Sequence, residues 1–294
     1  MAILAGKDTR LIVQGVTGRA GTFYTDQAIQ YGTRVVGGVR PGKGGSRQFD
    51  VPVFDSVSEA VRETGANASL IFVPAAGAAA AMIEAVEAGV PLVVCVTERV
   101  PLIDMARVRD ALLDSPTRLV GPNSQGVLAP GKSKIGVMST GDARPGRIGI
   151  ASRSASLTSE IVAQTSASGL GQSTTVGIGG DLIHGIGFVD CLELFMEDAE
   201  TDGVILIGEI GGHEEETAAE WLADTRPAKP VVALVAGRHA PPKRRMGHAG
   251  ALVTLGRGTA KSKIEALRGA GAYIAPNAHS VAETMRRALA EHRK

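Results

Sequence analysis

The 294-residue sequence contains few aromatic residues, few cysteines and no excess of charge of either sign. Aromatic residues are only 3% of the chain, whereas the 38 glycines favour tight turns and close approach of the backbone to itself or to a ligand. Cys95 and Cys191 each lie in an apolar run without a CxxC motif, so the sequence predicts neither a disulfide framework nor a cysteine metal site. Such cysteine usage is typical of a reducing cytosol.

Charge and hydropathy exclude further classes of protein. With 31 Lys and Arg against 30 Asp and Glu, the net charge of +1 provides no overall field that would attract nucleic acid or an anionic membrane. The apolar runs are of strand length or are broken by glycine and charged residues, and the amino terminus is too short and polar for a signal peptide. We therefore expect a cytoplasmic protein with no membrane segment and no nucleic-acid partner, in which any anion site is local.

The amino-terminal part of the chain alternates short apolar runs with stretches of helical periodicity. The runs predict strands at residues 10–14, 34–39, 68–73, 91–97 and 118–120. The stretches between them predict helices at residues 22–31, 56–65, 77–89 and 101–113. Strands rich in Val and Ile that alternate with helices are typical of a parallel sheet covered on both faces.

A segment dense in Gly, Pro and Ser, residues 121–147, interrupts this pattern and is expected to be a connector with an extended segment. A second alternation follows it. The strands are predicted at residues 148–151, 173–178, 203–207, 231–235 and 272–274, and the helices at residues 156–168, 190–197, 214–223, 260–269 and 280–292. Because the chain is long enough for two hydrophobic cores, we expect two doubly wound α/β domains.

The segment QGVTGRAGT, residues 14–22, ends the first strand and opens the first helix. Its glycines at 15, 18 and 21 permit a tight turn, and a helix amino terminus offers unpaired N–H groups to a phosphate. The spacing is GxxGxxG instead of the dinucleotide pattern GxGxxG, and glycines alone can serve only strand–helix packing. The segment therefore indicates a nucleotide-type site but does not exclude a role in strand–helix packing alone.

The end of the second strand bears on the ligand of that site. An NAD site carries an acid there for the ribose hydroxyls, whereas this chain has Arg40 and Lys43. Cations at this position favour a ligand with an extra phosphate near its ribose. Both NADP and coenzyme A fit that description.

Two segments of the second domain carry groups suited to anion chemistry. The serines of ASRSASLTSE, residues 151–160, can be ordinary helix N-caps, or they can cradle an oxyanion or phosphate together with Arg153. In LIGEIGG, residues 206–212, Glu209 ends a strand between glycines. It can be plain solvated surface, but if it contacts a histidine ring it fixes the tautomer and leaves the other nitrogen for a reacting atom.

His248 is the histidine best suited to such chemistry. Small residues surround it in MGHAGA, residues 246–251, so a bulky group fits on its ring, and three cations precede it at residues 243–245. A histidine in a flexible basic loop is the alternative interpretation. No second His, Cys or acid lies at ligand spacing nearby, so no metal site is predicted.

Nine motifs in order resemble the alpha-subunit family of succinyl-CoA synthetase, an enzyme of the tricarboxylic acid cycle, over essentially the whole chain. They begin with QGVTGRAGTFYTDQAIQYGTRVVGGVRPGKGG, IFVPAA and VTERVP, continue with VGPNSQGVLAPGKSKIG, ASRSASLTSE and STTVGIGGD, and end with IGEIGG, MGHAGA and GRGTA. The resemblance implies an α/β fold with a Rossmann-like CoA-binding domain at residues 1–124 and a connector at 125–147. A flavodoxin-like doubly wound parallel-sheet domain that carries a phosphohistidine is implied at residues 148–294.

The resemblance also implies an activity and a partner. The chain would be one subunit of an ADP- or GDP-forming acid–CoA ligase, with coenzyme A and a small carboxylic acid as substrates. A separate ATP-grasp beta subunit would bind ATP or GTP with its magnesium. Activity would therefore require an αβ or α2β2 hetero-oligomer.

Matching the family motifs residue by residue assigns the expected site. His248 corresponds to the phosphorylated histidine and Glu209 to the acid that supports it. The residues expected to bind the coenzyme are Thr17, Gly18, Arg19, Ala20, Lys43, Val96, Thr97 and Glu98. The residues expected near the phosphate and the acid are Ser154, Ala155, Ser156 and Ser159.

Departures from the family pattern lie around the expected acid pocket. Where the family usually has SRSGTLTYE, this chain has Ala155 in place of the glycine and Ser159 in place of the tyrosine. A usual Cys-Pro pair becomes Ser124-Gln125, and His184 stands where a proline is common. We expect succinate as the acid, with malate, citrate and sulfoacetate as alternatives, because loss of the tyrosine makes room and changes polarity.

Two other classes of function stay open on the residues alone. An NADP-dependent dehydrogenase would use the glycine turn with Arg40 and Lys43, but it leaves MGHAGA and SRSASLT without a role. A non-catalytic CoA-binding regulator would account for the altered acid pocket.

Overall fold

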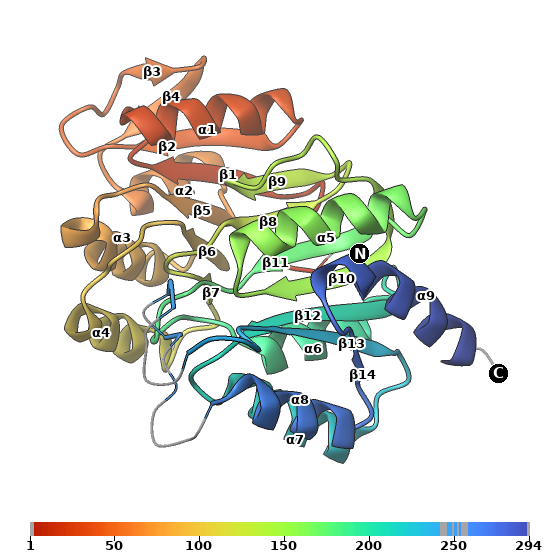
Figure 1. The fold of residues 1–294 in the computed structure, drawn as a ribbon. Helices are drawn as coiled ribbons and strands as arrows, with labels where there is room; N and C mark the ends of the chain where they lie inside the picture. The colour runs from red at the N-terminus through yellow and green to blue at the C-terminus, as the bar shows by residue number, and fades with distance from the viewer. Residues whose placement is uncertain (1–2, 242–245, 249, 252, 254–257, 293–294) are drawn as a thin grey trace. The chain divides into compact units, whose positions relative to one another are not determined.

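The computed structural model describes residues 3–241, 246–248, 250–251, 253 and 258–292. Within these residues the chain divides into two compact units, each built on its own sheet (Figure 1). One consists of Leu4–Met138 with Ile183–Gly185, and the other is built on Ser139–Leu182 and the chain from Ile186 onward. None of the helices described has both the length and the apolar character needed to cross a membrane.

The amino-terminal unit contains a sheet of order β3-β4-β2-β1-β5-β6-β7 (Figure 1). Its strands are β1 (Arg10–Gln14), β2 (Arg34–Val39), β3 (Arg47–Gln48), β4 (Val51–Phe54), β5 (Ala68–Ile71), β6 (Leu92–Cys95) and β7 (Arg118–Val120). Neighbouring strands are parallel except β3 and β4. From β4 to β7 this is the Rossmann order 3-2-1-4-5-6, which confirms the expected Rossmann-like fold.

The helices between these strands follow local signals in the sequence. They are α1 (Arg19–Gln30), α2 (Val57–Thr64), α3 (Ala75–Glu87) and α4 (Leu102–Leu112). Helix α2 shows why its bounds are predictable: the Ser56 side chain accepts the N–H of Glu59 at the start, and Gly65 ends the helix with a φ of 63°. Helix α1 begins three residues earlier than the sequence predicts.

The carboxy-terminal unit contains parallel strands in the order β14-β13-β12-β10-β11. These are β10 (Pro145–Ser152), β11 (Gln172–Gly177), β12 (Gly203–Glu209), β13 (Val231–Ala236) and β14 (Tyr273–Ile274). The order is the flavodoxin-like 2-1-3-4-5 pattern, as expected. The helices are α5 (Ala155–Ala167), α6 (Phe188–Glu197), α7 (Glu214–Thr225), α8 (Ala260–Gly269), α9 (Val281–His292) and the short 3-10 helix η1 (Ala278–Ser280).

The expected connector contains an antiparallel hairpin of β8 (Gly126–Ala129) and β9 (Ser133–Gly136) that belongs to the amino-terminal unit. Gly126 and Gly136 have φ of 98° and 125° and face each other across the hairpin. A Cβ on Gly126 would lie 1.9 Å from the carbonyl oxygen of Ile135, so glycine is required where the two backbones meet. The division at residues 1–124, 125–147 and 148–294 stays a prediction.

Gly21→Ala is expected to destabilise the amino-terminal unit, because a Cβ there would lie 2.1 Å from the carbonyl oxygen of Gly15. Overpacking of this kind costs about 1–3 kcal/mol of unfolding free energy, which urea denaturation measures. The control is Gly6→Ala, where a Cβ meets nothing within 4 Å. Equal destabilisation by the two substitutions would show that the Gly15–Gly21 contact is not the constraint.

Candidate functional site

The first candidate site lies where the strand order of the carboxy-terminal sheet reverses. β10 and β12 are adjacent and parallel, and the chain passes from β10 to β11 on one side before it returns to β12 on the other. The N–H of Arg153 donates to the carbonyl oxygen of Ile207 at 3.0 Å, so Arg153 begins its loop beside the end of β12, where Glu209 is the last residue. Crevices at such reversals are the usual ligand sites of open α/β sheets.

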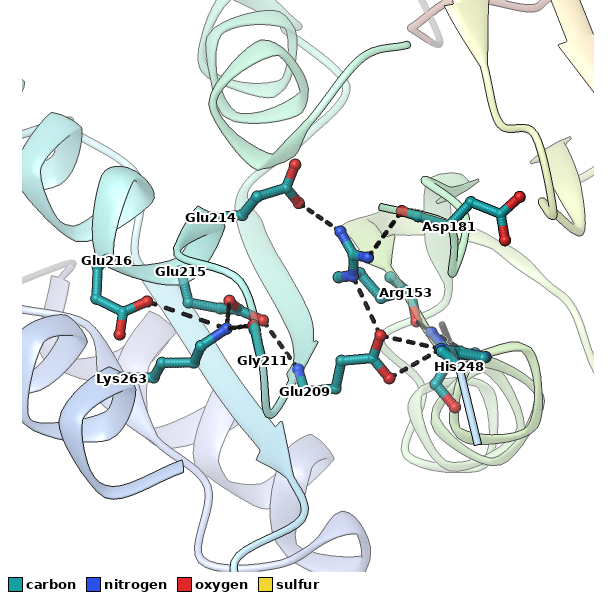
Figure 2. Close-up of polar contacts among 11 residues, drawn as sticks. Arg153, Asp181, Glu209, Gly211, Glu214, Glu215, Glu216, His248 and Lys263 are labelled. Atoms are coloured by element: carbon teal, nitrogen blue, oxygen red, sulfur yellow. Dashed lines mark hydrogen bonds and ion pairs between the residues drawn. The ribbon is translucent and has the colours of Figure 1, made fainter. Parts of the chain in front are cut away.

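His248 contacts Glu209 directly (Figure 2). The Nδ1 atom of His248 lies 2.8 Å from Oε2 and 3.0 Å from Oε1 of the Glu209 carboxylate. The side chain of Glu209 is 11% exposed and that of His248 is 31% exposed. Because a carboxylate only accepts, the ring donates from Nδ1–H, and Nε2 is left for another group. The alternative that Glu209 is plain solvated surface is therefore wrong.

Arg153 binds the same carboxylate at Oε1, which the His248 ring also contacts. Its Nε lies 3.3 Å from Glu209 Oε1, its Nη1 lies 2.8 Å from Glu214 Oε2, and its Nη2 donates to the carbonyl oxygen of Asp181 at 3.2 Å (Figure 2). Burial by itself lowers the pKa of Arg153, but the Glu214 and Glu209 carboxylates outweigh it and the pKa is raised. The guanidinium is thus a fixed cation in the site.

The charge of the histidine ring reflects these neighbours. The hydrogen bond that His248 donates to Glu209 raises the pKa of His248 above 6.5, while burial and the positive charge of Arg153 act in the opposite direction. The ring lies on the backbone of Gly180, where a Cβ would be 2.7 Å from the His248 Cγ. A nucleophilic Nε2 requires the neutral ring, so chemistry at this atom should increase as the pH rises through the raised pKa.

The loop that presents His248 is described only in part. Lys243, Arg244, Arg245 and Ala249, which the sequence analysis singled out, lie outside the described residues. Within the described part, the N–H of Ala251 donates to the His248 carbonyl oxygen at 3.1 Å and Met246 N–H donates to the Ala251 carbonyl oxygen at 3.0 Å. Together with Gly247 at a φ of 75°, these bonds form a turn around the histidine.

The expected phosphate and acid residues lie at the start of α5. Ser154 is the N-cap, and its Oγ accepts the N–H of Leu157 and lies 3.4 Å from the Ser156 Oγ. The N-cap interpretation is therefore confirmed. Ala155, Ser156 and Ser159 are exposed, and the Ser159 hydroxyl donates to the Ala155 carbonyl oxygen at 3.3 Å. The first turn of α5 contains no acid, so its N–H groups are suited to an anion.

The second candidate site lies in the amino-terminal unit, at the carboxyl end of β1. Thr17, Gly18, Arg19 and Ala20 form an exposed turn into α1, with Gly18 as the N-cap and no acid in the first helical turn. Gly15 and Gly21 pack against each other, so the glycines do serve strand–helix packing. At the exposed turn, no side chain of the N-cap residue is hydrogen-bonded to the first N–H groups of α1.

Lys43 lies in the exposed loop after β2, which pairs with β1. The Asp55 carboxylate orders this loop by accepting the N–H groups of Gly44 at 2.9 Å and Lys43 at 3.1 Å. These backbone bonds, chiefly that from Gly44, lower the pKa of Asp55. The side chains of Arg40 and Lys43 are exposed, as an anion site near β1 requires.

Val96, Thr97 and Glu98 follow β6 at the same edge of the amino-terminal sheet. The Thr97 hydroxyl donates to the carbonyl oxygen of Val73 at 2.7 Å and ties this loop to the one after β5. Val96 is half-buried and Glu98 is exposed. In the part of the chain that the structure describes, no group of three or more His, Cys, Asp or Glu could hold a metal ion.

Sequence analysis missed the charged residues behind Glu209, which are Glu214, Glu215 and Lys263. A signal for two of them was present. Glu215 lies on the buried stripe of α7 with Ala218, Ala219 and Leu222, and Lys263 lies on that of α8 with Ala260, Ile264 and Leu267. A charge at a core position of an amphipathic helix needs a buried partner, so opposite charges on the stripes of two consecutive helices predict a pair.

Glu209→Gln is expected to lower the pKa of His248 toward or below 6.5, because the main group that favours the charged ring is lost while Arg153 stays. Because the pKa of His248 is higher in the folded chain than in the unfolded chain, protonation of the ring stabilises the folded chain. This contribution is fully present below pH 6.5 and is lost as the pH rises through the folded-state pKa. An NMR titration of the ring, with urea denaturation on both sides of pH 6.5, checks this. Glu214→Gln, which removes a carboxylate bound to Arg153, should shift the pKa less.

Comparison with known proteins places the chain in a family. Residues 6–99 match the CoA binding domain family and residues 151–273 match the CoA-ligase family. The chain is 53% identical over 291 residues to the ADP-forming succinate–CoA ligase subunit alpha of Aquifex aeolicus, covering 98% of this chain and 95% of the relative. It is 50% identical over 283 residues to the ADP-forming succinate–CoA ligase subunit alpha 2 of Archaeoglobus fulgidus, covering 96% of this chain and 98% of the relative.

A solved structure agrees with the fold. The ATP citrate lyase from Methanothrix soehngenii, in complex with citrate and coenzyme A, matches 99% of this chain with a TM-score of 0.87 at 23% identity. The present chain spans 51% of that longer chain, and at this identity the likeness concerns the fold alone. On the near full-length relatives and the two domain matches, the chain belongs to the family of succinate–CoA ligase alpha subunits, acid–CoA ligases with a CoA-binding domain followed by a CoA-ligase domain.

Proposed function

We propose that the chain is the alpha subunit of an ADP- or GDP-forming succinate–CoA ligase in which His248 carries a phosphoryl group between substrates. The observation that carries this proposal is the 2.8 Å contact between His248 Nδ1 and the nearly buried Glu209 carboxylate. The His248 side chain is itself 31% exposed. An oriented ring with one nitrogen engaged and the other accessible is what a nucleophilic histidine requires.

In the first step, the Nε2 lone pair of neutral His248 attacks the γ-phosphorus of the nucleoside triphosphate. The bond from that phosphorus to the bridging oxygen breaks, and the nucleoside diphosphate leaves with the electron pair. The ring becomes positively charged as the P–N bond forms, with its proton still on Nδ1. The Glu209 carboxylate at 2.8 Å stabilises this charge, so the phosphoryl group is held in a reactive form.

In the second step, a carboxylate oxygen of the acid attacks the phosphorus, the P–N bond breaks, and its electron pair returns to Nε2. The product is an acyl phosphate. In the third step, the thiolate of coenzyme A attacks the acyl carbon, and the C–O bond to the phosphate breaks. Inorganic phosphate is the leaving group, and the thioester is the product. The amino terminus of α5, with Ser154 and Ser156, is suited to bind the phosphate because its N–H groups and hydroxyls all donate.

Coenzyme A is proposed to bind the amino-terminal unit. The turn formed by Thr17, Gly18, Arg19 and Ala20 offers N–H groups to a phosphate, and Lys43 supplies a nearby cation. The loop of Val96, Thr97 and Glu98 lies at the same edge of the sheet. An ATP-grasp beta subunit is proposed to bind ATP or GTP with magnesium, in a cytoplasmic αβ or α2β2 complex.

Succinate is the acid we propose, because relatives at 53% and 50% identity bear that substrate in their names. Ser159 in place of a family tyrosine is exposed on α5 and leaves malate, citrate and sulfoacetate as alternatives. Comparing thioester formation by the reconstituted complex with each acid separates them, and succinate is expected to give the highest kcat/KM.

His248→Asn is expected to abolish phosphorylation of the chain by γ-labelled ATP in the presence of the beta subunit, because Nε2 of the ring is replaced by an amide. Intact-mass analysis and acid lability of the label identify a phosphohistidine. Glu214→Gln is a folded control that keeps the histidine. No label on the wild-type chain would exclude the proposed function and favour a CoA-binding regulator. Full label on His248→Asn would exclude His248 as the carrier of the phosphoryl group.

Lys43→Ala is expected to weaken binding of coenzyme A about tenfold, the effect of losing one charge-assisted hydrogen bond, and to leave dephospho-coenzyme A binding unchanged. Isothermal titration calorimetry measures both ligands. The matched control is Lys7→Ala, which removes an exposed lysine that precedes β1 at its amino end. Tight binding of NADPH that depends on Lys43 would instead support the dehydrogenase alternative.

A further inference from the structure

A buried ion pair lies behind Glu209 (Figure 2). Lys263 of α8 is 0% exposed and Glu215 of α7 is 2% exposed, and Lys263 Nζ forms an ion pair with Glu215 Oε2. The family comparison and the proposed chemistry assign no role to either residue. Each charge occupies a position on an otherwise apolar helical stripe.

The pair contacts the backbone at the end of β12. The second oxygen of Glu215, Oε1, accepts the N–H of Glu209 at 2.8 Å. The ammonium of Lys263 also donates to the carbonyl oxygen of Gly211. The pair therefore binds the main chain on both sides of Ile210, in the segment that carries the acid of the site.

Besides the pair, this part of the backbone is held by the Gly211 N–H, which donates to the carbonyl oxygen of Gly258 at 2.8 Å. Gly211 and Gly212 have φ of 87° and 60°, and glycines have the greatest conformational freedom in an unrestrained turn. Gly208 precedes Glu209, and a Cβ at this position would lie 2.3 Å from Glu215 Oε1. The Glu215 carboxylate thus lies directly on the strand end, in space that only a glycine leaves open.

Stability alone does not explain the pair. Two buried opposite charges can often be replaced by apolar side chains without loss of stability, because their desolvation offsets their attraction. A pair that served only to join α7 to α8 would need no contact with β12. The two bonds to Glu209 and Gly211 are therefore the part of the arrangement that calls for a function.

Resting on the proposed function, we infer that Lys263 and Glu215 are positioning residues for phosphoryl transfer at His248. They hold the main chain of Glu209 and Gly211 so that the Glu209 carboxylate stays within hydrogen-bond distance of Nδ1. Neither residue touches the reacting atoms. Their effect passes through the hydrogen bonds to the main chain at Glu209 and Gly211, and then through the Glu209 carboxylate, to the ring.

Two double variants of the full chain separate this role from a structural one. Lys263→Met/Glu215→Met removes both charges and the acceptor for Glu209 N–H, while apolar side chains of similar length fill the space. Lys263→Met/Glu215→Gln also removes both charges but keeps a carbonyl oxygen that can accept this N–H. The two proteins differ only in that acceptor. Both lose the 4.0 Å ion pair of Lys263 with the partly exposed Glu216, so this loss is the same in the two and does not affect their comparison. Leu222→Ala on α7 is the control for loss of stability alone.

The first measurement is the NMR titration of His248 in the unphosphorylated chain, and the second is the single-turnover rate of phosphorylation with the beta subunit at saturating ATP. With Lys263→Met/Glu215→Met, the His248 pKa should move toward 6.5 and the rate should fall about 10- to 100-fold, with KM for ATP unchanged. Lys263→Met/Glu215→Gln should recover part of both effects. Leu222→Ala should lower the thermal midpoint without changing pKa or rate.

Wild-type pKa and rate in the Lys263→Met/Glu215→Met protein would overturn the inference, as would equal changes in Leu222→Ala. Failure of the proposed function has a different signature, since the wild-type chain would then take no label on His248. The titration needs neither nucleotide nor beta subunit, so it decides whether the pair positions Glu209 even in that case.

Discussion

The Glu209 carboxylate, shared between the His248 ring and the Arg153 guanidinium, is the interaction on which the chemistry of the carboxy-terminal unit depends. A carboxylate that is 11% exposed would be costly to ionise without a partner. Arg153 supplies that partner as a fixed cation, and the carboxylate accepts from Nδ1 of the His248 ring. The ring is therefore oriented by a carboxylate that Arg153 itself holds in place.

The same cation limits the effect of the acid. Glu209 favours a protonated ring, whereas burial of the ring and the charge of Arg153 disfavour it, and the net result is a raised pKa of His248. A ring held fully protonated would be no nucleophile, whereas a ring without an acid would be poorly oriented and would gain no stabilisation on phosphorylation. Placing one carboxylate between a permanent and a titratable cation satisfies both requirements.

Both sheets place their candidate sites by the same topological rule. In a parallel sheet the carboxyl ends of all strands lie at one edge. The loops that follow two adjacent strands lead to opposite faces of the sheet where the strand order reverses. β1 with β5 forms that point in the amino-terminal unit, and β10 with β12 forms it in the carboxy-terminal unit. The glycine turn before α1 and the serine turn before α5 are therefore equivalent features of two different doubly wound folds.

Many of the elements were predictable because their signals are local. The strands at Arg10–Gln14, Arg34–Val39 and Arg118–Val120 and the helix at Ala260–Gly269 have the bounds that apolar runs and periodicity predict. The connector was expected to contain an extended segment, but its hairpin of β8 and β9 was missed because Gly126 and Gly136, which look like loop residues, are needed where the two backbones meet. Tight backbone contact between strands has no signature within a single short window of sequence.

The sequence by itself determined the two α/β domains, the glycine and serine turns, and the identity of His248 and Glu209 as candidates, since each depends on residues close together in the chain or on motifs in order. Tertiary structure alone decided the contacts of those candidates. His248 and Glu209 are 39 residues apart and Arg153 and Glu209 are 56 apart, so their distances follow from how β10, β12 and the histidine loop pack. The partners of Lys263 and Glu215 were decided in the same way, because burial of a charge becomes tolerable only when folding brings its counter-charge and backbone acceptors to it.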